Sequence, residues 1–222
     1  MLRQSGFTLM ELMIVTAIVG ILAGVAVPTL IGSRAVANER AVLATMRTIA
    51  TAQAQIMGSR SLDADHDGMG EAIGLLELAG AADLRGTTVR LSPTGLTHAL
   101  GTADANGYVP YKGYLLALYL PDASGLGVLA VPANNGSIDT DQAELGWSCL
   151  AWPVRRGNSG TATFFVNHTG EVLACRDATY SGTTSVPPPG AGLVGVAATQ
   201  ILGGEPAADT IGADGNLWRT LR

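Results

Sequence analysis

The sequence predicts an α+β protein in which one long N-terminal helix packs on a small antiparallel β-sheet head. Three observations support this fold class. An almost uncharged apolar run covers Phe7–Gly32, and a helical spacing of apolar residues continues from there to Met57. Strand-like runs separated by short loops follow in the second half of the chain. A long helix followed by a series of strands indicates the α+β class.

Length and composition limit the kinds of protein that this chain can be. Its 222 residues suggest one domain with an anchor, and only 14% of them are charged. The net charge is −5, and an acidic, lysine-poor chain lacks the basic surface that nucleic acid binding needs. Two cysteines are too few for a disulfide scaffold or a cysteine-based zinc site.

The run Phe7–Gly32 is long enough to span a membrane. It contains 26 residues with one charge, and about 20 apolar residues in a helix cross a hydrocarbon core. The alternative is a cleaved secretory signal peptide. Here, however, the leader MLRQSG (residues 1–6) ends in a small residue before the apolar run rather than after it. We therefore expect residues 7–32 to stay in the mature protein as an anchor.

Arg3 precedes the anchor and predicts a cytoplasmic N-terminus, with the remainder of the chain exported. We expect a single-pass protein of the bacterial inner membrane. After the anchor, residues 33–58 continue as an amphipathic helix, and residues 59–222 form the exported head. The head ends in a Gly/Pro-rich tail that we expect to be mostly irregular.

Glu11 is the only charged residue of the apolar run. A carboxylate inside a bilayer costs several kcal/mol unless it is paired. No Lys, Arg or His lies between Phe7 and Gly32, so we expect its partner to come from another chain. If the chain is cut after Gly6, the new α-amino group of Phe7 on a neighbour displaced by about one helical turn could neutralise Glu11. The alternative is a carboxylate that snorkels to the headgroups.

The motif SGFTLMELMIV resembles the class III signal of type IV prepilins and type II secretion pseudopilins. In that family a membrane peptidase cuts after the glycine and methylates the new N-terminal phenylalanine. The resemblance implies that Gly6 is the cleavage-site residue, Phe7 the methylated N-terminus and Glu11 the fifth mature residue. It also implies a pilin-like fold, a homo-oligomeric filament, prepilin peptidase and an inner-membrane assembly platform as partners, and contact with membrane lipid before assembly.

Three further residues of the anchor bear on assembly. Gly20 and Gly24 have the small-xxx-small spacing that lets apolar helices approach closely. Pro28 falls where the resembled family often has a helix-loosening proline. Because proline removes a backbone hydrogen bond, we expect a kink or local melting over Gly24–Pro28. Beyond it, Val42, Met46, Ile49 and Ile56 recur at helical spacing.

An acidic segment, DADHDGMGE, follows the helix. Its alternating carboxylates before a glycine match the start of a calcium loop, with candidate ligands Asp63, Asp65, Asp67 and Glu71. Gly74 stands where such a loop has its bidentate glutamate, so Glu71 or Glu77 would have to replace it. The alternative is a solvated acidic turn that caps a helix over Glu71–Leu78.

The predicted strands cover Gly113–Leu120, Trp147–Val154, Thr161–Asn167 and Glu171–Arg176. Short loops between the last three favour antiparallel hairpins and a sheet of three or four strands. Cys149 and Cys175 could form one disulfide in an exported domain. In a simple meander, however, both would flank the middle strand at about 9.6 Å, which is too far for a bridge. Both outcomes stay open.

We expect a structural subunit of a type II secretion pseudopilus or type IV pilus-like filament, and the acidic segment slightly favours the pseudopilus. The alternative is a membrane-tethered exported module, with calcium as a candidate ligand, that uses the leader without forming filaments. We do not expect an enzyme. No nucleophile motif, phosphate loop or HExxH pattern is present, and His66, His98 and His168 are far apart in the chain.

Overall fold

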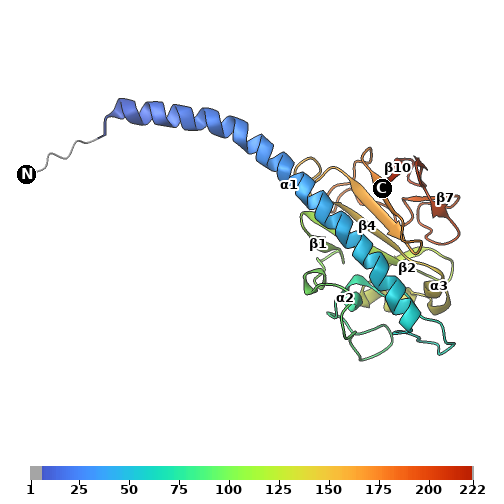
Figure 1. The fold of residues 1–222 in the computed structure, drawn as a ribbon. Helices are drawn as coiled ribbons and strands as arrows, with labels where there is room; N and C mark the ends of the chain where they lie inside the picture. Colours follow the sequence, from blue (N-terminus) through green and yellow to red (C-terminus); the bar gives the residue numbers. More distant parts are fainter. Residues whose placement is uncertain (1–6, 222) are drawn as a thin grey trace, which may run out of the picture.

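The computed structural model describes residues 7–221 and confirms the predicted α+β architecture. Helix α1 covers Leu9–Ser59, and its N-terminal half projects away from a head formed by the rest of the chain (Figure 1). It has 51 residues, begins two residues after the predicted start at Phe7 and ends one residue after the predicted end at residue 58. It ends because Arg60 adopts a left-handed conformation with φ 53°, and its N–H bonds to the carbonyls of Ile56 and Met57.

The second half of α1 packs on the sheet through one face. Its buried residues are Ala35, Val42, Met46, Ile49, Ala52, Gln53 and Ile56. Most are three, four or seven positions apart, which places them on one face of the helix. Gln53, which the sequence alone would place among polar surface residues, is fully buried because its side chain bonds both to the N–H and to the C=O of Ile73. This pair ties the helix to the segment after the acidic loop.

Of the kink or local melting expected over Gly24–Pro28, the melting is wrong, because α1 is continuous through this segment. Proline removes one hydrogen bond of the helical ladder, whereas its neighbours keep theirs. The hydroxyl of Thr29 donates to the carbonyl of Val25 at 3.1 Å, adding a contact in the same turn. Figure 1 shows the helix curving between its free half and the head rather than breaking.

The head is built on one antiparallel sheet in the order β1-β2-β4-β5-β6-β10-β9, with β3 also paired to β2. The main strands are β2 (Tyr114–Pro121), β4 (Ser148–Pro153), β5 (Thr163–Asn167) and β6 (Val172–Cys175), which confirm the four predicted runs. Smaller strands are β1 (Val109–Tyr111), β3 (Gly127–Leu129), β9 (Thr210–Ile211) and β10 (Leu217–Thr220). A separate pair joins β7 (Leu193–Val194) to β8 (Glu205–Pro206).

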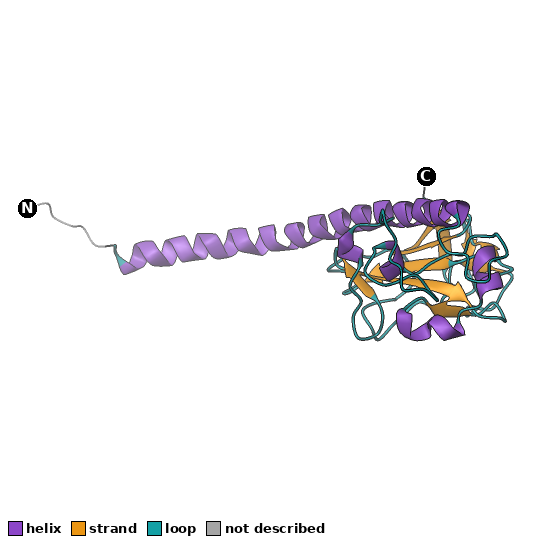
Figure 2. Ribbon diagram, turned by 90° about the horizontal axis from the view of Figure 1, so that it is seen from below, coloured by secondary structure: helices purple, strands orange, loops and turns teal. Residues whose placement is uncertain are grey.

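Both faces of the sheet are buried. Helix α1 lies along one face, as Figure 2 shows, and contacts β4, β5 and β6. The opposite face is covered by the C-terminal region, including Ala191, Leu193 and Trp218. Trp218 is fully buried and meets Phe165 edge to face at a centroid distance of 6.0 Å. The tail therefore completes a second core, in addition to the one between α1 and the sheet.

The two cysteines are free and buried, so the structure contradicts a disulfide between Cys149 and Cys175. Strands β4, β5 and β6 form the simple meander, in which Cys149 lies opposite Val166 and Cys175 opposite Thr163. Cys149 packs in the core under α1, whereas Cys175 packs on the other face of the sheet. The two sulfur atoms are therefore separated by a strand and by the sheet itself.

Short helices complete the head: α2 (Leu75–Leu78), a 3₁₀ turn over His98–Leu100, another over Pro132–Ser137, and α3 (Thr140–Leu145). The helix predicted over Glu71–Leu78 is wrong in its first half. Residues 71–74 are not helical, because Glu71 and Ile73 use their backbone N–H groups for bonds to Leu62 and Gln53.

Candidate functional site: an exposed apolar helix and an acidic loop

The free half of α1 is an apolar surface with no partner within the chain. Phe7, Leu9 and Ile21 expose 83%, 76% and 71% of their surface, and the large apolar side chains between Phe7 and Ile31 are all exposed. Among residues 7–221, α1 is the one helix long and apolar enough to cross a membrane. Leaving one such side chain in water forgoes about 1.5–3 kcal/mol. This segment therefore needs lipid or other apolar helices around it.

Glu11 lies at the start of this helix and forms a capping box with Thr8. Its Oε2 accepts from the Thr8 backbone N–H at 2.9 Å and from the Thr8 hydroxyl at 2.8 Å. In return, Glu11 N–H donates to the Thr8 hydroxyl oxygen at 3.2 Å. The pattern Thr-x-x-Glu in the sequence is typical of this box, although no role was predicted for Thr8. These bonds satisfy one carboxylate oxygen but bring no positive charge.

Gly20 and Gly24 lie on the exposed part of α1, and a Cβ built on either residue would meet no atom within 4 Å. Their smallness is therefore not needed for packing inside this chain. A glycine costs roughly 0.5–1 kcal/mol in a helix relative to alanine. The open surface at both positions is consistent with the close helix approach predicted for them.

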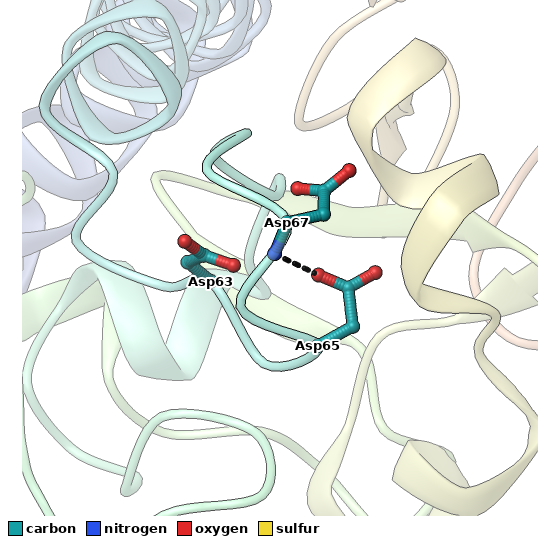
Figure 3. Close-up of side chains that lie close together, drawn as sticks. All are labelled: Asp63, Asp65 and Asp67. Atoms are coloured by element: carbon teal, nitrogen blue, oxygen red, sulfur yellow. Dashed lines mark hydrogen bonds between the residues drawn. The ribbon is translucent and has the colours of Figure 1, made fainter.

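The acidic loop gathers three of the four predicted metal ligands. Ligand oxygens of Asp63, Asp65 and Asp67 lie within 4.8 Å of one another. Figure 3 shows the three carboxylates around one turn of the loop, where Asp65 Oδ1 accepts from the Asp67 N–H at 3.2 Å. Gly68 makes the turn possible with φ 91°, and its N–H donates to Asp63 Oδ2 at 3.2 Å. Asp63 Oδ1 is buried and accepts no hydrogen bond within the described residues.

The structure corrects the assignment of Glu71 as a ligand. Its side chain is fully buried and forms an ion pair with Arg85, and its Oε1 also accepts from the Ala64 N–H at 2.7 Å. Glu77 is buried as well, where it accepts from the N–H groups of Gly74 and Arg85 at 2.5 and 2.6 Å. Burial raises the pKa of Glu77. Both glutamates that could have completed the loop are thus used inside the head.

Helix α3 supplies acidic groups that the sequence did not connect with the loop. A hydrogen bond with Asp65 is the largest cause of the raised pKa of Asp141, followed by desolvation and the charges of Asp139, Asp65 and Asp67. Desolvation, and then the charges of Asp67 and Asp65, raise the pKa of Glu144. Calcium binds six to eight oxygen ligands, so an oxygen-rich cluster from two segments suits such a cation. No signal in a single sequence relates residues 63–67 to 141–144.

Comparison with known families adds two findings. A family model described as the prokaryotic N-terminal methylation motif matches residues 1–27. A second, described as protein of unknown function (DUF2950), matches residues 27–179, which is more than half of the chain. The chain belongs to the DUF2950 family. No curated protein and no solved structure gives a significant match.

The two matches meet at residue 27, within the first half of α1. The methylation motif covers the leader and most of the exposed half of the helix, which identifies a type IV pilin-like precursor with a membrane-anchoring segment. The DUF2950 match begins beside Pro28 and ends just after β6. The C-terminal region that covers the second core lies beyond it. The predicted cleavage residue Gly6 lies outside the described residues, whereas Phe7 is exposed next to the capping box.

Proposed function

We propose that this chain is a structural subunit of a filament of the type II secretion pseudopilus or type IV pilus kind. In this proposal a prepilin peptidase cuts after Gly6 and the Phe7 amine is methylated. The free halves of α1 then bundle into an apolar core, and the heads face outward. No catalytic activity is assigned to the chain, and the assembly platform is a separate inner-membrane machine.

The observation that carries this proposal is an exposed apolar helix with one uncompensated carboxylate at its start. Thr8 gives Glu11 hydrogen bonds but no charge, and no cation lies between Phe7 and Gly32. A free amine on Phe7 of a neighbouring copy, displaced by about one turn along the axis, would supply that charge. The methylation motif at residues 1–27 supports processing that creates this amine.

We also propose that the N-terminus is cytoplasmic and the head exported. Arg3 supports this orientation, but Arg34 and Arg40 follow the apolar half closely on the other side. Counting cations alone would therefore favour the opposite topology. We therefore base the proposed orientation on the methylation motif. The cations after the apolar run do not rule out export of the head, because long domains cross the membrane largely regardless of flanking charge.

The first test is the intact mass of the protein purified from its native membrane. We expect a species that begins at Phe7 and carries one extra methyl group. A chain that still begins at Met1, or one that is cut after the apolar run, would remove the amine that Glu11 needs. Either result would contradict the proposal.

The second test separates charge from helix capping. Glu11→Gln keeps an oxygen that can accept from Thr8 but removes the charge, whereas Thr8→Ala removes the cap and keeps the charge. We expect Glu11→Gln to abolish filaments recovered by shearing, while Thr8→Ala still assembles, with both variants cleaved and stable. If Glu11→Gln assembles like the parent, pairing with the amine is wrong. If the parent forms no filaments yet keeps its cellular role, the tethered-module alternative is favoured.

A further inference from the structure

Cations gather on the head where α1 leaves it. Arg34, Ile31 and Asn38 of α1 line one hollow together with Gly113, Val154 and Arg155. Arg40 lines an adjacent hollow on the other side of the β4–β5 loop, and Lys112 precedes Gly113 in the β1–β2 turn. We call Arg34, Arg40, Lys112 and Arg155 the collar.

The loop that carries Arg155 is fixed to the helix. The side-chain amide of Asn38 donates to the carbonyl of Ser159 at 3.0 Å. Glu39 accepts from the N–H and the hydroxyl of Thr161, both at 2.8 Å, and from Arg176 at 3.1 Å. The collar is therefore a rigid surface held around the root of the apolar helix.

The four collar cations are exposed, and none is paired with a carboxylate within the described residues. Two neighbouring cations differ from them. Arg176 is paired with Glu39, and Arg156 donates to the carbonyls of Thr161 and Arg176. The chain as a whole has a net charge of −5, so this concentration of free cations contrasts with the rest of the protein. The far end of the head, by comparison, carries the acidic loop and Asp141.

The position of the collar along α1 corresponds to the edge of a membrane. From Leu9 to Ile31 the helix rises about 33 Å, enough to cross a hydrocarbon core of about 30 Å. Arg34 follows one turn later, at the level of the lipid headgroups. Ile31 and Val154 lie in the same hollow as Arg34 and Arg155 and expose 37% and 38% of their surface. Apolar side chains flanked by cations are typical of surfaces that lie in the membrane interface.

We propose that the collar binds anionic phospholipid headgroups on the side of the membrane where the head lies, and so holds the head against the bilayer. The acidic end of a second copy is the other anionic surface that could meet it. The depth of the collar and the exposed Ile31 and Val154 favour lipid, since an acidic protein surface offers no apolar layer. This inference needs only membrane anchoring and does not depend on filament formation.

The test uses the full chain in vesicles of phosphatidylcholine, alone or mixed with phosphatidylglycerol. A fluorophore is attached to Asn158→Cys at the collar or to Ser61→Cys at the far end of the head, since both native cysteines are buried. Quenching by lipids with a nitroxide on the headgroup reports contact with the membrane surface. We expect stronger quenching at Asn158→Cys in the anionic vesicles, falling in 1 M salt where the Debye length is about 3 Å.

Charge variants decide whether the collar is responsible. Each cation near an anionic surface contributes about a fivefold change in binding, so Arg34→Gln/Arg155→Gln should lower the docked-to-undocked ratio about 25-fold. Arg47→Gln/Arg60→Gln removes the same charge from exposed positions outside the collar and should have little effect. Equal quenching in neutral and anionic vesicles, or equal effects of the two variants, would overturn the proposal. So would quenching that depends on the protein-to-lipid ratio, because it would indicate that a second copy occupies the collar.

Discussion

Arg85 stabilises two buried glutamates that are distant from it in the sequence. It lies eight residues beyond Glu77 and fourteen beyond Glu71, yet it contacts both buried glutamates. Its guanidinium is the cation that pairs with Glu71, whose side chain is fully buried. Removing one partner of a buried ion pair leaves an uncompensated charge in a low-dielectric interior.

We expect Arg85→Ala to lower the free energy of unfolding by about 3–5 kcal/mol, because Glu71 is left buried and unpaired. The measurement is denaturant unfolding of the full chain in detergent, followed by tryptophan fluorescence. All three tryptophans, Trp147, Trp152 and Trp218, are buried in the head, so their signal reports its unfolding. Arg90→Ala is the matched control. It breaks the exposed pair with Asp83, which contributes about 0–1 kcal/mol. Equal effects of the two variants would contradict this assignment.

Among the elements, the acidic loop and α3 together form a cluster of carboxylates that neither segment would form by itself. Helix α3 begins at Thr140 with Asp139 as its N-cap, whose side chain accepts from the Gln142 N–H at 3.0 Å. This places Asp141 beside Asp65 and Glu144 near Asp67. The carboxylates repel one another, and a bound cation would remove that repulsion.

Calcium binding remains a prediction, and it has a direct measurement. Added calcium should raise the unfolding temperature of the head, because a ligand that binds only the folded state stabilises it by mass action. Asp63→Asn/Asp65→Asn should abolish the rise, whereas Asp209→Asn, at an exposed turn, should leave it intact. A rise that persists in the loop variant would show that calcium acts elsewhere. No rise in the parent would leave the solvated acidic turn as the correct interpretation.

The same unit predicts a pH dependence in cation-free buffer. The pKa of Asp141 is raised above its ordinary value of 3.8 in the folded protein, so the unfolded chain loses its proton first as pH rises. The contribution of Asp141 to the free energy of unfolding is therefore fully present below its ordinary pKa of 3.8, and it is lost as the pH rises through the higher pKa of the folded state. Asp141→Asn should flatten the fall in unfolding free energy as the pH rises above about 4. An unchanged slope would mean that the group is not coupled to the loop.

At the scale of the whole molecule, the sheet separates two cores. The first joins α1 to the sheet, and the second is closed by residues after β6, beyond the DUF2950 match. Strand β10 returns to pair with β6, with Arg219 opposite Ala174, and so places Trp218 against Phe165. The tail is therefore part of the folded head, although most of it lacks regular structure.

Trp218→Ala should lower the free energy of unfolding by about 3–5 kcal/mol, as truncation of a buried tryptophan does. Ile211→Ala is the control, because Ile211 on the adjacent strand is 62% exposed and its truncation should change stability by at most about 0.5 kcal/mol. Unfolding is again followed by fluorescence of Trp147 and Trp152. A loss of less than about 1 kcal/mol for Trp218→Ala would mean that the second core contributes little to the stability of the head.

Features that depend on neighbours along the chain could be predicted from the amino-acid sequence. The buried face of α1 could be predicted because its burial follows the helical period. The apolar run and the main strands could be predicted as continuous apolar stretches, since both faces of the sheet are buried. The leader motif is likewise a continuous stretch. Thr8 belongs here too, since its capping box could have been predicted from Thr-x-x-Glu.

Which distant residues lie close together depends on the three-dimensional fold. The fold placed Arg85 beside Glu71, Asp141 beside Asp65 and Arg155 beside Arg34. It also kept Cys149 and Cys175 apart on opposite faces of the sheet. Each of these pairs is separated by between 14 and more than 100 residues, so no local period relates them. Their relative positions follow from how the strands and loops pack together, which is set by the whole head rather than by any one segment.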